Sequence, residues 1–170
     1  MLLKLDLAKA FDRLSWKYLA GILKAYGFDQ RWINWIMSMV GTPVMSILLN
    51  ESPSEAFTPS HGLRQGDPLS PFLFILAAEG LGRLVKAQVS RDQIKGLRIY
   101  EEEILISHQK FVENVMLYGQ ATLKEAQRII KSLSQFSKAS GMEINKDKSE
   151  VFFFNTSLAT KKIPGTHSRL

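Results

Sequence analysis

Residues 62–71 read GLRQGDPLSP, and the rest of the chain can be organised around this loop. Two glycines within five residues let the backbone approach another group closely, because glycine has no Cβ. Arg64 supplies a forked cation, and two prolines stiffen the start of the apolar segment that follows. A plainer interpretation also fits, with Ser70 as the N-cap of a helix and Pro71 as its first residue. Both interpretations place the loop directly before a helix.

The segments on either side of this loop predict an α+β fold. Apolar residues recur at helical spacing in four segments, residues 15–26, 30–40, 70–89 and 122–141. In the fourth helix Thr122 and Glu125 predict a capping box. The residues of the second helix that are expected to face inward are Trp32, Ile33, Ile36, Met39 and Val40. Strands are predicted at residues 2–7, 44–50, 56–60, 95–100, 103–107, 115–118 and 151–154, with residues 51–53 as a hairpin turn. This order predicts an antiparallel sheet with helices packed on one face.

The composition indicates one folded domain and excludes several classes of protein. With 170 residues, 45% hydrophobic and 22% charged, the chain can bury a sizeable core. The absence of cysteine excludes disulfides, thiolate metal sites and the small secreted scaffolds. The longest apolar run, residues 71–78, is far short of the ~20 residues that span a bilayer. The net charge of +6 fits a polyanionic partner such as nucleic acid, although many basic proteins bind none.

Two acidic segments are candidates for metal binding. Asp6 ends the first predicted strand and is followed by an aromatic and a second acid in DLAKAFD, residues 6–12. Glu113 lies in FVEN, residues 111–114, between two short apolar strands. Taken alone, each has a simpler explanation, since a strand-end aspartate is usually a turn or cap residue and an acidic hairpin tip is usually solvated.

Taken together, these motifs resemble the reverse transcriptase domain of non-LTR (LINE-type) retrotransposons. Residues 5–12 resemble the first carboxylate motif of that family, and residues 62–71 match its second motif. Residues 140–149, from Ser140-Gly141 through Asn145 to Lys148-Ser149, resemble the segment that closes the polymerase palm. The order and spacing agree over residues 2–155, and the ten-residue second motif is specific. The resemblance therefore implies a palm-like α+β domain that extends a DNA primer on an RNA template from dNTPs.

The resemblance also implies a metal centre. Polymerases of this kind align two Mg²⁺ ions on aspartates, one activating the primer 3′-hydroxyl and one steadying the triphosphate. In this chain Asp6 is expected to be the first metal ligand, beside the backbone carbonyl of Leu7. Glu113 and Asn114 occupy the hairpin positions of the remaining catalytic acids, with Glu113 as an impaired metal ligand.

Five further residues take nucleotide or template roles by the same resemblance. Phe11 is expected beneath the incoming sugar, where a bulky ring rejects a 2′-hydroxyl. Arg64, Gln65 and Gly66 are expected to border the nascent base pair. Lys148 is expected near the triphosphate, as a catalytic proton donor or charge partner of the leaving pyrophosphate.

The hairpin motif departs from the family pattern, which is aromatic-Ala-Asp-Asp. Glu113 carries its oxygens one methylene further out than Asp, and Mg²⁺ requires near-octahedral ligands at ~2.0–2.1 Å. Asn114 removes a negative charge, and Val112 places a β-branched side chain in a tight turn. We therefore expect polymerase activity to be lost, with Mg²⁺ or Mn²⁺ as cofactor if any activity remains.

Residues 1–155 are expected to form the palm-like domain, truncated without complete fingers or thumb, and residues 156–170 a polar, basic, disordered tail. Two alternatives stay open. One is a co-opted nucleic-acid-binding or protein-interaction module, and the other is a weak, metal-dependent residual polymerase. The sequence predicts neither a membrane protein nor a secreted one, and leaves a nuclear or cytoplasmic location and the oligomeric state open.

Overall fold

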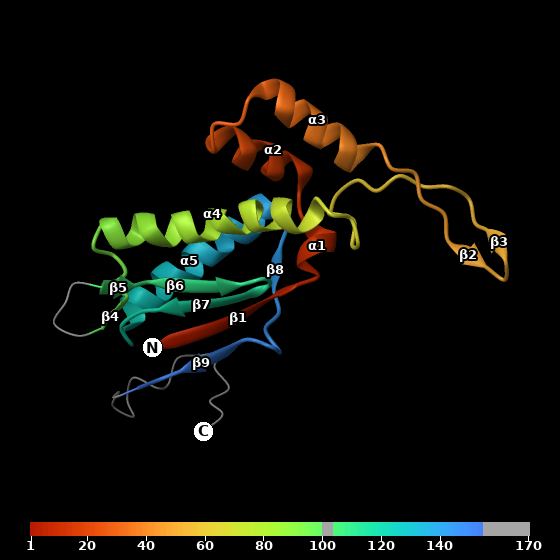
Figure 1. Ribbon diagram of the computed structural model, residues 1–170. Coiled ribbons are helices and arrows are strands. Elements are labelled where there is room, and N and C mark those ends of the chain that lie inside the picture. Colours follow the sequence, from red (N-terminus) through yellow and green to blue (C-terminus); the bar gives the residue numbers. More distant parts are fainter. Residues whose placement is uncertain (100–103, 155–170) are drawn as a thin grey trace.

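The computed structural model describes residues 1–99 and 104–154. Figure 1 shows a layered body from which one long hairpin projects. The helices and strands, in chain order, are β1 (Leu2–Ala8), α1 (Ala10–Arg13), α2 (Trp16–Ala25), α3 (Gln30–Gly41), β2 (Leu48–Leu49), β3 (Ser52–Pro53), α4 (Ser70–Ser90), β4 (Leu97–Ile99), β5 (Ile104–Ile106), β6 (His108–Phe111), β7 (Asn114–Tyr118), α5 (Leu123–Ser140), β8 (Glu143–Ile144) and β9 (Glu150–Phe152).

A five-stranded antiparallel sheet forms the base of the fold. Its central strand β1 pairs with β7 along one side, and with β8 and β9 along the other. The alternation in β1 explains this position, because Leu3, Leu5 and Leu7 are buried while Lys4 and Asp6 between them remain half-buried. The sheet therefore has one apolar face and one polar face.

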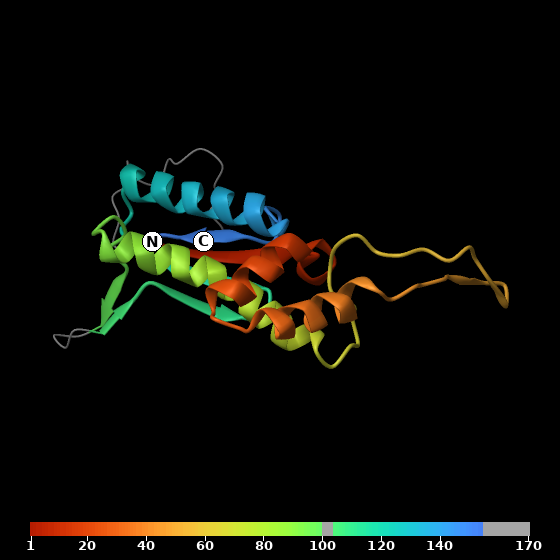
Figure 2. The same cartoon turned by 90° about the horizontal axis from the view of Figure 1, so that it is seen from above.

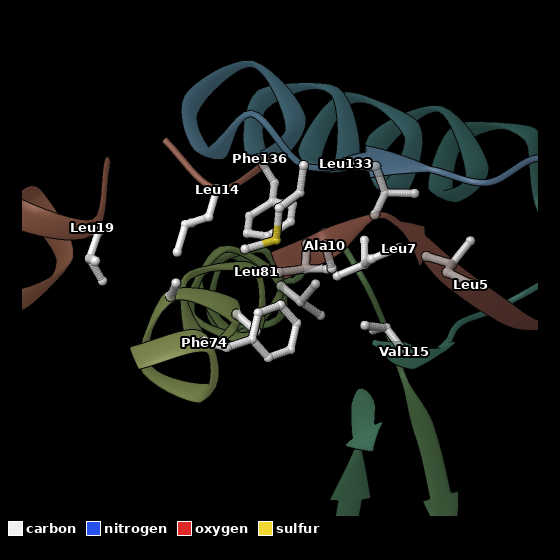
Figure 3. Close-up of a cluster of buried hydrophobic side chains, with 14 of the residues drawn as sticks. Leu5, Leu7, Ala10, Leu14, Leu19, Phe74, Leu81, Val115, Leu133 and Phe136 are labelled. Carbon is white, nitrogen blue, oxygen red and sulfur yellow. The ribbon is translucent and has the colours of Figure 1, made fainter. Parts of the chain in front are cut away.

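The helices cover the apolar face. α4 and α5 lie side by side over the sheet, and α2 packs against both of them (Figures 1 and 2). Figure 3 shows the core between these layers, where Leu5 and Val115 of the sheet meet Leu81 of α4 and Leu133 of α5. The predicted α+β class, an antiparallel sheet with helices on one face, is confirmed.

The projecting hairpin is real, but its turn was predicted wrongly. The turn lies at Asn50 and Glu51, both in the left-handed region with φ of 47° and 64°, and Pro53 pairs with Leu48 instead of lying in the turn. Positive φ at both central residues is the geometry that best fits the twist of a two-residue hairpin, and asparagine tolerates it. The turn was predicted at residues 51–53 but lies at residues 50–51, and Ser52 and Pro53 belong to the second strand of the hairpin.

The inward face of α3 was predicted correctly at Ile33 and Ile36 but wrongly at Trp32 and Met39. Ile33 and Ile36 are buried, but Trp32 and Met39 are 36% and 52% exposed. α3 packs on α2 at the outside of the body, so that only a narrow stripe of the helix is covered. A hydrophobic period marks the stripe but does not fix its width.

Two helix caps differ from prediction. Thr122 caps α5 as expected, but the Glu125 carboxylate accepts a hydrogen bond from the Lys95 backbone N–H (3.0 Å) instead of reaching back to Thr122. Ser70 is the first residue of α4, not its N-cap, and the N-cap Leu69 makes no side-chain cap. For Glu125, a tertiary contact took the side chain away from its local role.

Three short elements, α1, β6 and β8, were not predicted, because each has four residues or fewer and shows no clear hydrophobic period. The predicted strands that include Tyr100 and residue 103 extend outside the described residues, as does the predicted tail at residues 156–170. Within the described part of the chain, none of the helices has the length and apolar character needed to cross a membrane.

Candidate active site

The site is built on the end of β1, where the backbone of Asp6 is held by the turn at residues 145–149. Its backbone N–H donates to Ser149 Oγ (3.2 Å) and its carbonyl accepts from the Asn145 N–H (2.9 Å). Leu5 and Leu7 point into the core, so the Asp6 side chain points to the opposite, polar face of the sheet. The central strand thus presents one carboxylate on the face that no helix covers.

The β6–β7 hairpin brings the altered motif to the same place. Asn114 lies opposite Asp6 in the β1–β7 register, and the Glu113 carbonyl accepts a hydrogen bond from the Leu7 N–H (3.1 Å). Val112 and Glu113 form the turn, with Val112 at a φ of 52°. A β-branched residue in the left-handed region is a conformational outlier, which agrees with the predicted misfit of Val112.

An open cleft of about 470 Å³ joins these residues. Six of the nine predicted site residues line it, namely Asp6, Leu7, Phe11, Gln65, Glu113 and Lys148. The rest of the lining is Ala8, Lys9, Ala10 and Asn145. The other three, Asn114, Arg64 and Gly66, do not line the cleft, but Asn114 lies beside it, opposite Asp6 in the sheet.

Backbone hydrogen bonds join the loop at residues 62–71 to the segment that follows β1. The Gly62 N–H donates to the Leu14 carbonyl (2.8 Å), and the Leu63 N–H donates to the Phe11 carbonyl (2.7 Å). Gly62 has a φ of +84°, and a Cβ built on it would lie 2.5 Å from the Asp12 carbonyl oxygen. Trp16 Nε1 donates to the Gly62 carbonyl (2.6 Å). The glycine is therefore required by a close backbone approach, as its place in the motif predicts.

Two side chains of this loop point in different directions. Gln65 reaches the cleft and its Nε2 donates to Asp12 Oδ1 (3.0 Å). Arg64 instead forms an ion pair with Asp67 (2.5 Å). The hydrogen bond from Arg64, with one from the Leu69 N–H, lowers the pKa of Asp67 below its ordinary value. Arg64 therefore stabilises its own loop in this structure, and no contact places it at the cleft.

Phe11 and Lys148 are held by different means. The Phe11 ring stacks on Phe74 of α4, with ring centroids 4.5 Å apart and an interplanar angle of 17°. Lys148 is exposed, but its backbone is held by Asn145, whose Oδ1 accepts from the N–H groups of Asp147 (3.1 Å) and Lys148 (3.3 Å). Asn145 was named within the motif at residues 140–149 but was given no role. Its side chain forms an Asx-turn, which holds the backbone that carries Lys148.

The donor set fits a pair of dications poorly. Asp6 and Glu113 are the acids that line the cleft, and Asn114 presents an uncharged amide beside them. Within residues 1–99 and 104–154, no three His, Cys, Asp or Glu side chains are grouped so that they could hold a metal ion. Mg²⁺ prefers carboxylate oxygens in a strict octahedron, and two such ions need more negative charge than this site offers.

Comparison with known proteins agrees with the geometry. The family model described as "Reverse transcriptase (RNA-dependent DNA polymerase)" matches residues 1–165. The chain is 31% identical over 147 residues to "Transposon TX1 uncharacterized 149 kDa protein" of Xenopus laevis, covering 86% of this chain and 11% of that protein. It is 28% identical over 144 residues to "Retrovirus-related Pol polyprotein from type-2 retrotransposable element R2DM" of Drosophila melanogaster, covering 85% of this chain and 13% of that polyprotein.

The fold is also found among solved structures. Apo telomerase from Candida tropicalis, truncated from its C-terminal domain, superposes with a TM-score of 0.68 at 14% sequence identity, covering 92% of this chain and 31% of that one. This similarity shows a shared fold. The family match and the two transposon relatives go further: this chain belongs to the reverse transcriptase (RNA-dependent DNA polymerase) family, as a reverse transcriptase domain of the non-LTR retrotransposon kind.

Proposed function

We propose that this chain is the palm of a non-LTR reverse transcriptase whose polymerase chemistry was lost at the β6–β7 hairpin. One observation carries the proposal: Glu113 and Asn114 stand where the family has two aspartates, and Asn114 lies directly opposite Asp6 in the sheet. Residues 1–155 would form this palm-like domain. The proposed ligands are RNA template, DNA primer and dNTP.

The metal-binding side of the cleft supports the proposed loss of polymerase activity. Divalent metal ions, Mg²⁺ or Mn²⁺, supply activation of the primer hydroxyl in this family. In this chain Asp6, Glu113 and the Leu7 carbonyl would be the ligands. Glu113 can reach the cleft, but its carboxylate extends from a strained turn, and displacing a reacting group by about 1 Å can cost ~10²-fold in rate. Asn114 cannot neutralise a dication.

On the nucleotide side of the cleft, the residues with proposed nucleotide roles are still present. Phe11, stacked on Phe74, would be the ring beneath the incoming sugar. Gln65 would border the nascent base pair: an ionised Asp12 carboxylate only accepts hydrogen bonds, so it holds the amide NH₂ group and leaves the amide oxygen free to face a ligand. Lys148 would meet the triphosphate from the Asn145 turn. For Arg64 and Gly66 a template role rests on the motif alone.

The test is primer extension on a poly(A) template with an oligo(dT) primer, in Mg²⁺ and separately in Mn²⁺. The wild-type chain is compared with Glu113→Asp/Asn114→Asp, and Asp6→Ala is the blank. We expect the wild type to match the blank and the double variant to exceed it. Extension by the wild type above the blank would instead establish the residual polymerase and overturn the proposal.

A second readout does not depend on turnover. A metal ion that binds only the folded state stabilises it and so raises Tm in thermal unfolding. At a metal concentration of a hundred times Kd, the stabilisation is about 2.7 kcal/mol. We expect Tm of the double variant to rise with added metal while Tm of the wild type stays unchanged. If neither protein responds and neither extends a primer, the lesion does not lie at this hairpin alone.

A further inference from the structure

A second cleft of about 700 Å³ opens next to the catalytic one. Lys9 lines both clefts, so they adjoin. The second cleft has walls from three separate segments, namely the α1–α2 connection, the loop before α4 and the turn after α5; its lining is Lys9, Asp12, Arg13, Ser15, Trp16, Lys17, Ser60, His61 and Gly141. Among these residues, the resemblance to the family gives none a nucleotide, template or metal role.

The charge of this cleft is positive. Lys9, Arg13 and Lys17 line it, against one acid, Asp12, whose Oδ1 already accepts from Gln65. Arg13 forms an ion pair with Glu143. Lys9 and Lys17 are exposed, and across the described residues neither forms an ion pair with a carboxylate. Two cations of the cleft are therefore available to an anionic ligand.

The walls are held rigidly by backbone contacts. Gly62 and Gly141, with φ of +84° and +79°, press against the chain between them, where a Cβ on either would lie 2.5 Å from a carbonyl oxygen, that of Asp12 or Arg13 respectively. The Ser15 N–H donates to the Ser140 carbonyl (2.7 Å). A cleft assembled in this way is formed before any ligand arrives, so binding need not order it.

We propose that this second cleft binds the phosphate backbone of a single nucleic-acid strand that continues from the catalytic cleft. Lys9 before α1, Arg13 in α1 and Lys17 in α2 line a cleft of about 700 Å³, which is larger than a small anion needs. Lys9 also lines the catalytic cleft, where template and primer are proposed to lie. The half-buried Trp16 and the serines beside the cations suit a sugar–phosphate chain better than a compact ion. The inference rests on the proposed descent from a reverse transcriptase, but it does not require polymerase activity.

The test is fluorescence anisotropy of labelled oligo(dT) and oligo(U) with the full chain over a range of salt concentrations. The cleft variant is Lys9→Asn/Arg13→Gln/Lys17→Gln, with asparagine at position 9 because Lys9 has a φ of 47°. The matched control is Arg91→Gln/Lys124→Gln/Lys131→Gln, which removes the same charge from exposed residues that do not line the cleft, at the C-cap of α4 and in α5. Thermal melts establish that both variants fold.

We expect the cleft variant to bind at least ~10-fold more weakly, with a salt slope smaller by about 2, since each phosphate contact on a single strand contributes roughly 0.7. The control should change affinity less than ~2-fold. Equal weakening in both variants, or none in either, would overturn the inference. So would competition by poly-glutamate as strong as that by unlabelled oligonucleotide, because the site would then accept any polyanion.

The two proposals fail separately. If the wild-type chain binds no oligonucleotide at low salt, the second cleft is not a nucleic-acid site, whatever primer extension shows. If the wild type extends a primer, the lost-chemistry proposal fails, but the contrast between the cleft variant and its control keeps its meaning.

Discussion

The two walls of the catalytic cleft differ in what holds them. The loop at residues 62–71 is joined to the chain after β1 by backbone hydrogen bonds, by the Trp16 indole and by a glycine that allows contact with a carbonyl oxygen. The opposite wall, the β6–β7 hairpin, ends in a turn where Val112 has a positive φ and Asn114 replaces an acid. One wall depends on backbone geometry, whereas the other is the wall where we propose that the catalytic side chains have been lost.

Under the proposed function, this difference means that the fold has outlasted the activity. Replacing Asp with Asn at position 114 leaves the antiparallel pairing with Asp6 intact, because the ladder uses only backbone groups. A substitution at Gly62 would instead disturb the contact between two segments of the body. The comparison can be tested by changing each wall separately and measuring stability.

The largest effect is expected at Gly62. Gly62→Ala adds a Cβ 2.5 Å from the Asp12 carbonyl at a φ of +84°, so we expect a loss of roughly 3 kcal/mol or more in the free energy of unfolding. Gly66→Ala is the matched control, because Gly66 has a φ of +87° but nothing within 4 Å of the added atom. It should lose only about 1–2 kcal/mol, the cost of the left-handed conformation.

Urea unfolding of the three proteins measures the difference. Equal losses in Gly62→Ala and Gly66→Ala would mean that the close approach relaxes easily and that the loop wall is not held by geometry. The comparison between the walls would then collapse.

The next effect concerns how the hairpin arms are anchored. Lys110 of β6 forms an ion pair with Glu79 of α4, and the two side chains are 17% and 32% exposed. Burial raises the pKa of Glu79, but the hydrogen bond and charge of Lys110 outweigh it, so the pKa lies below its usual 4.5. Lys110→Met should cost about 1–2 kcal/mol at pH 7, because it leaves a half-buried carboxylate without its donor.

The loss should depend on pH in one direction. A carboxyl whose pKa is depressed by folding stabilises the protein above its unfolded value, and this contribution is lost as pH falls through the folded pKa. The gap between wild type and Lys110→Met should therefore shrink as pH falls below about 4.5. Lys4→Met is the control, since its pair with Glu150 is more than 40% exposed on both sides and should be worth at most ~0.5 kcal/mol. A gap that stays constant down to pH 3 would mean that the pair does not anchor the hairpin.

Local periodicity allowed β1, β7, β9 and the main helices to be predicted, and the resemblance to the family named six of the ten residues that line the cleft. The alternation of β1 determined which face Asp6 occupies, and Ser15 capped α2 as expected. What could not be predicted was which partner a polar side chain takes: Arg64 turned toward Asp67 of its own loop, and Glu125 toward the Lys95 backbone. The motif at residues 140–149 included Asn145 but gave it no role, because its contact with the Asp6 carbonyl exists only in the folded chain.

The smallest expected effect tests the tip of the hairpin. Val112 has a φ of 52° and is 49% exposed, so it gains little from burial while it carries the strain of the left-handed region. That conformation costs an L-residue about 1–2 kcal/mol, whereas glycine adopts it freely but loses roughly 0.5–1 kcal/mol through its greater unfolded-state freedom. Val112→Gly should therefore stabilise the protein by about 0.5–1 kcal/mol.

Val112→Ala separates the two possible causes of strain at this turn. Alanine removes the β-branch but keeps a Cβ at positive φ, so it should recover less stability than glycine does if the backbone conformation is the main cost. Unfolding in urea measures all three proteins. A stabilised Val112→Gly that still fails to extend a primer would show that strain and lost chemistry at this wall are separate defects, because only the carboxylates at positions 113 and 114 can restore the charge. A destabilised Val112→Gly would mean that the turn is not strained, and the two walls would then differ in chemistry alone.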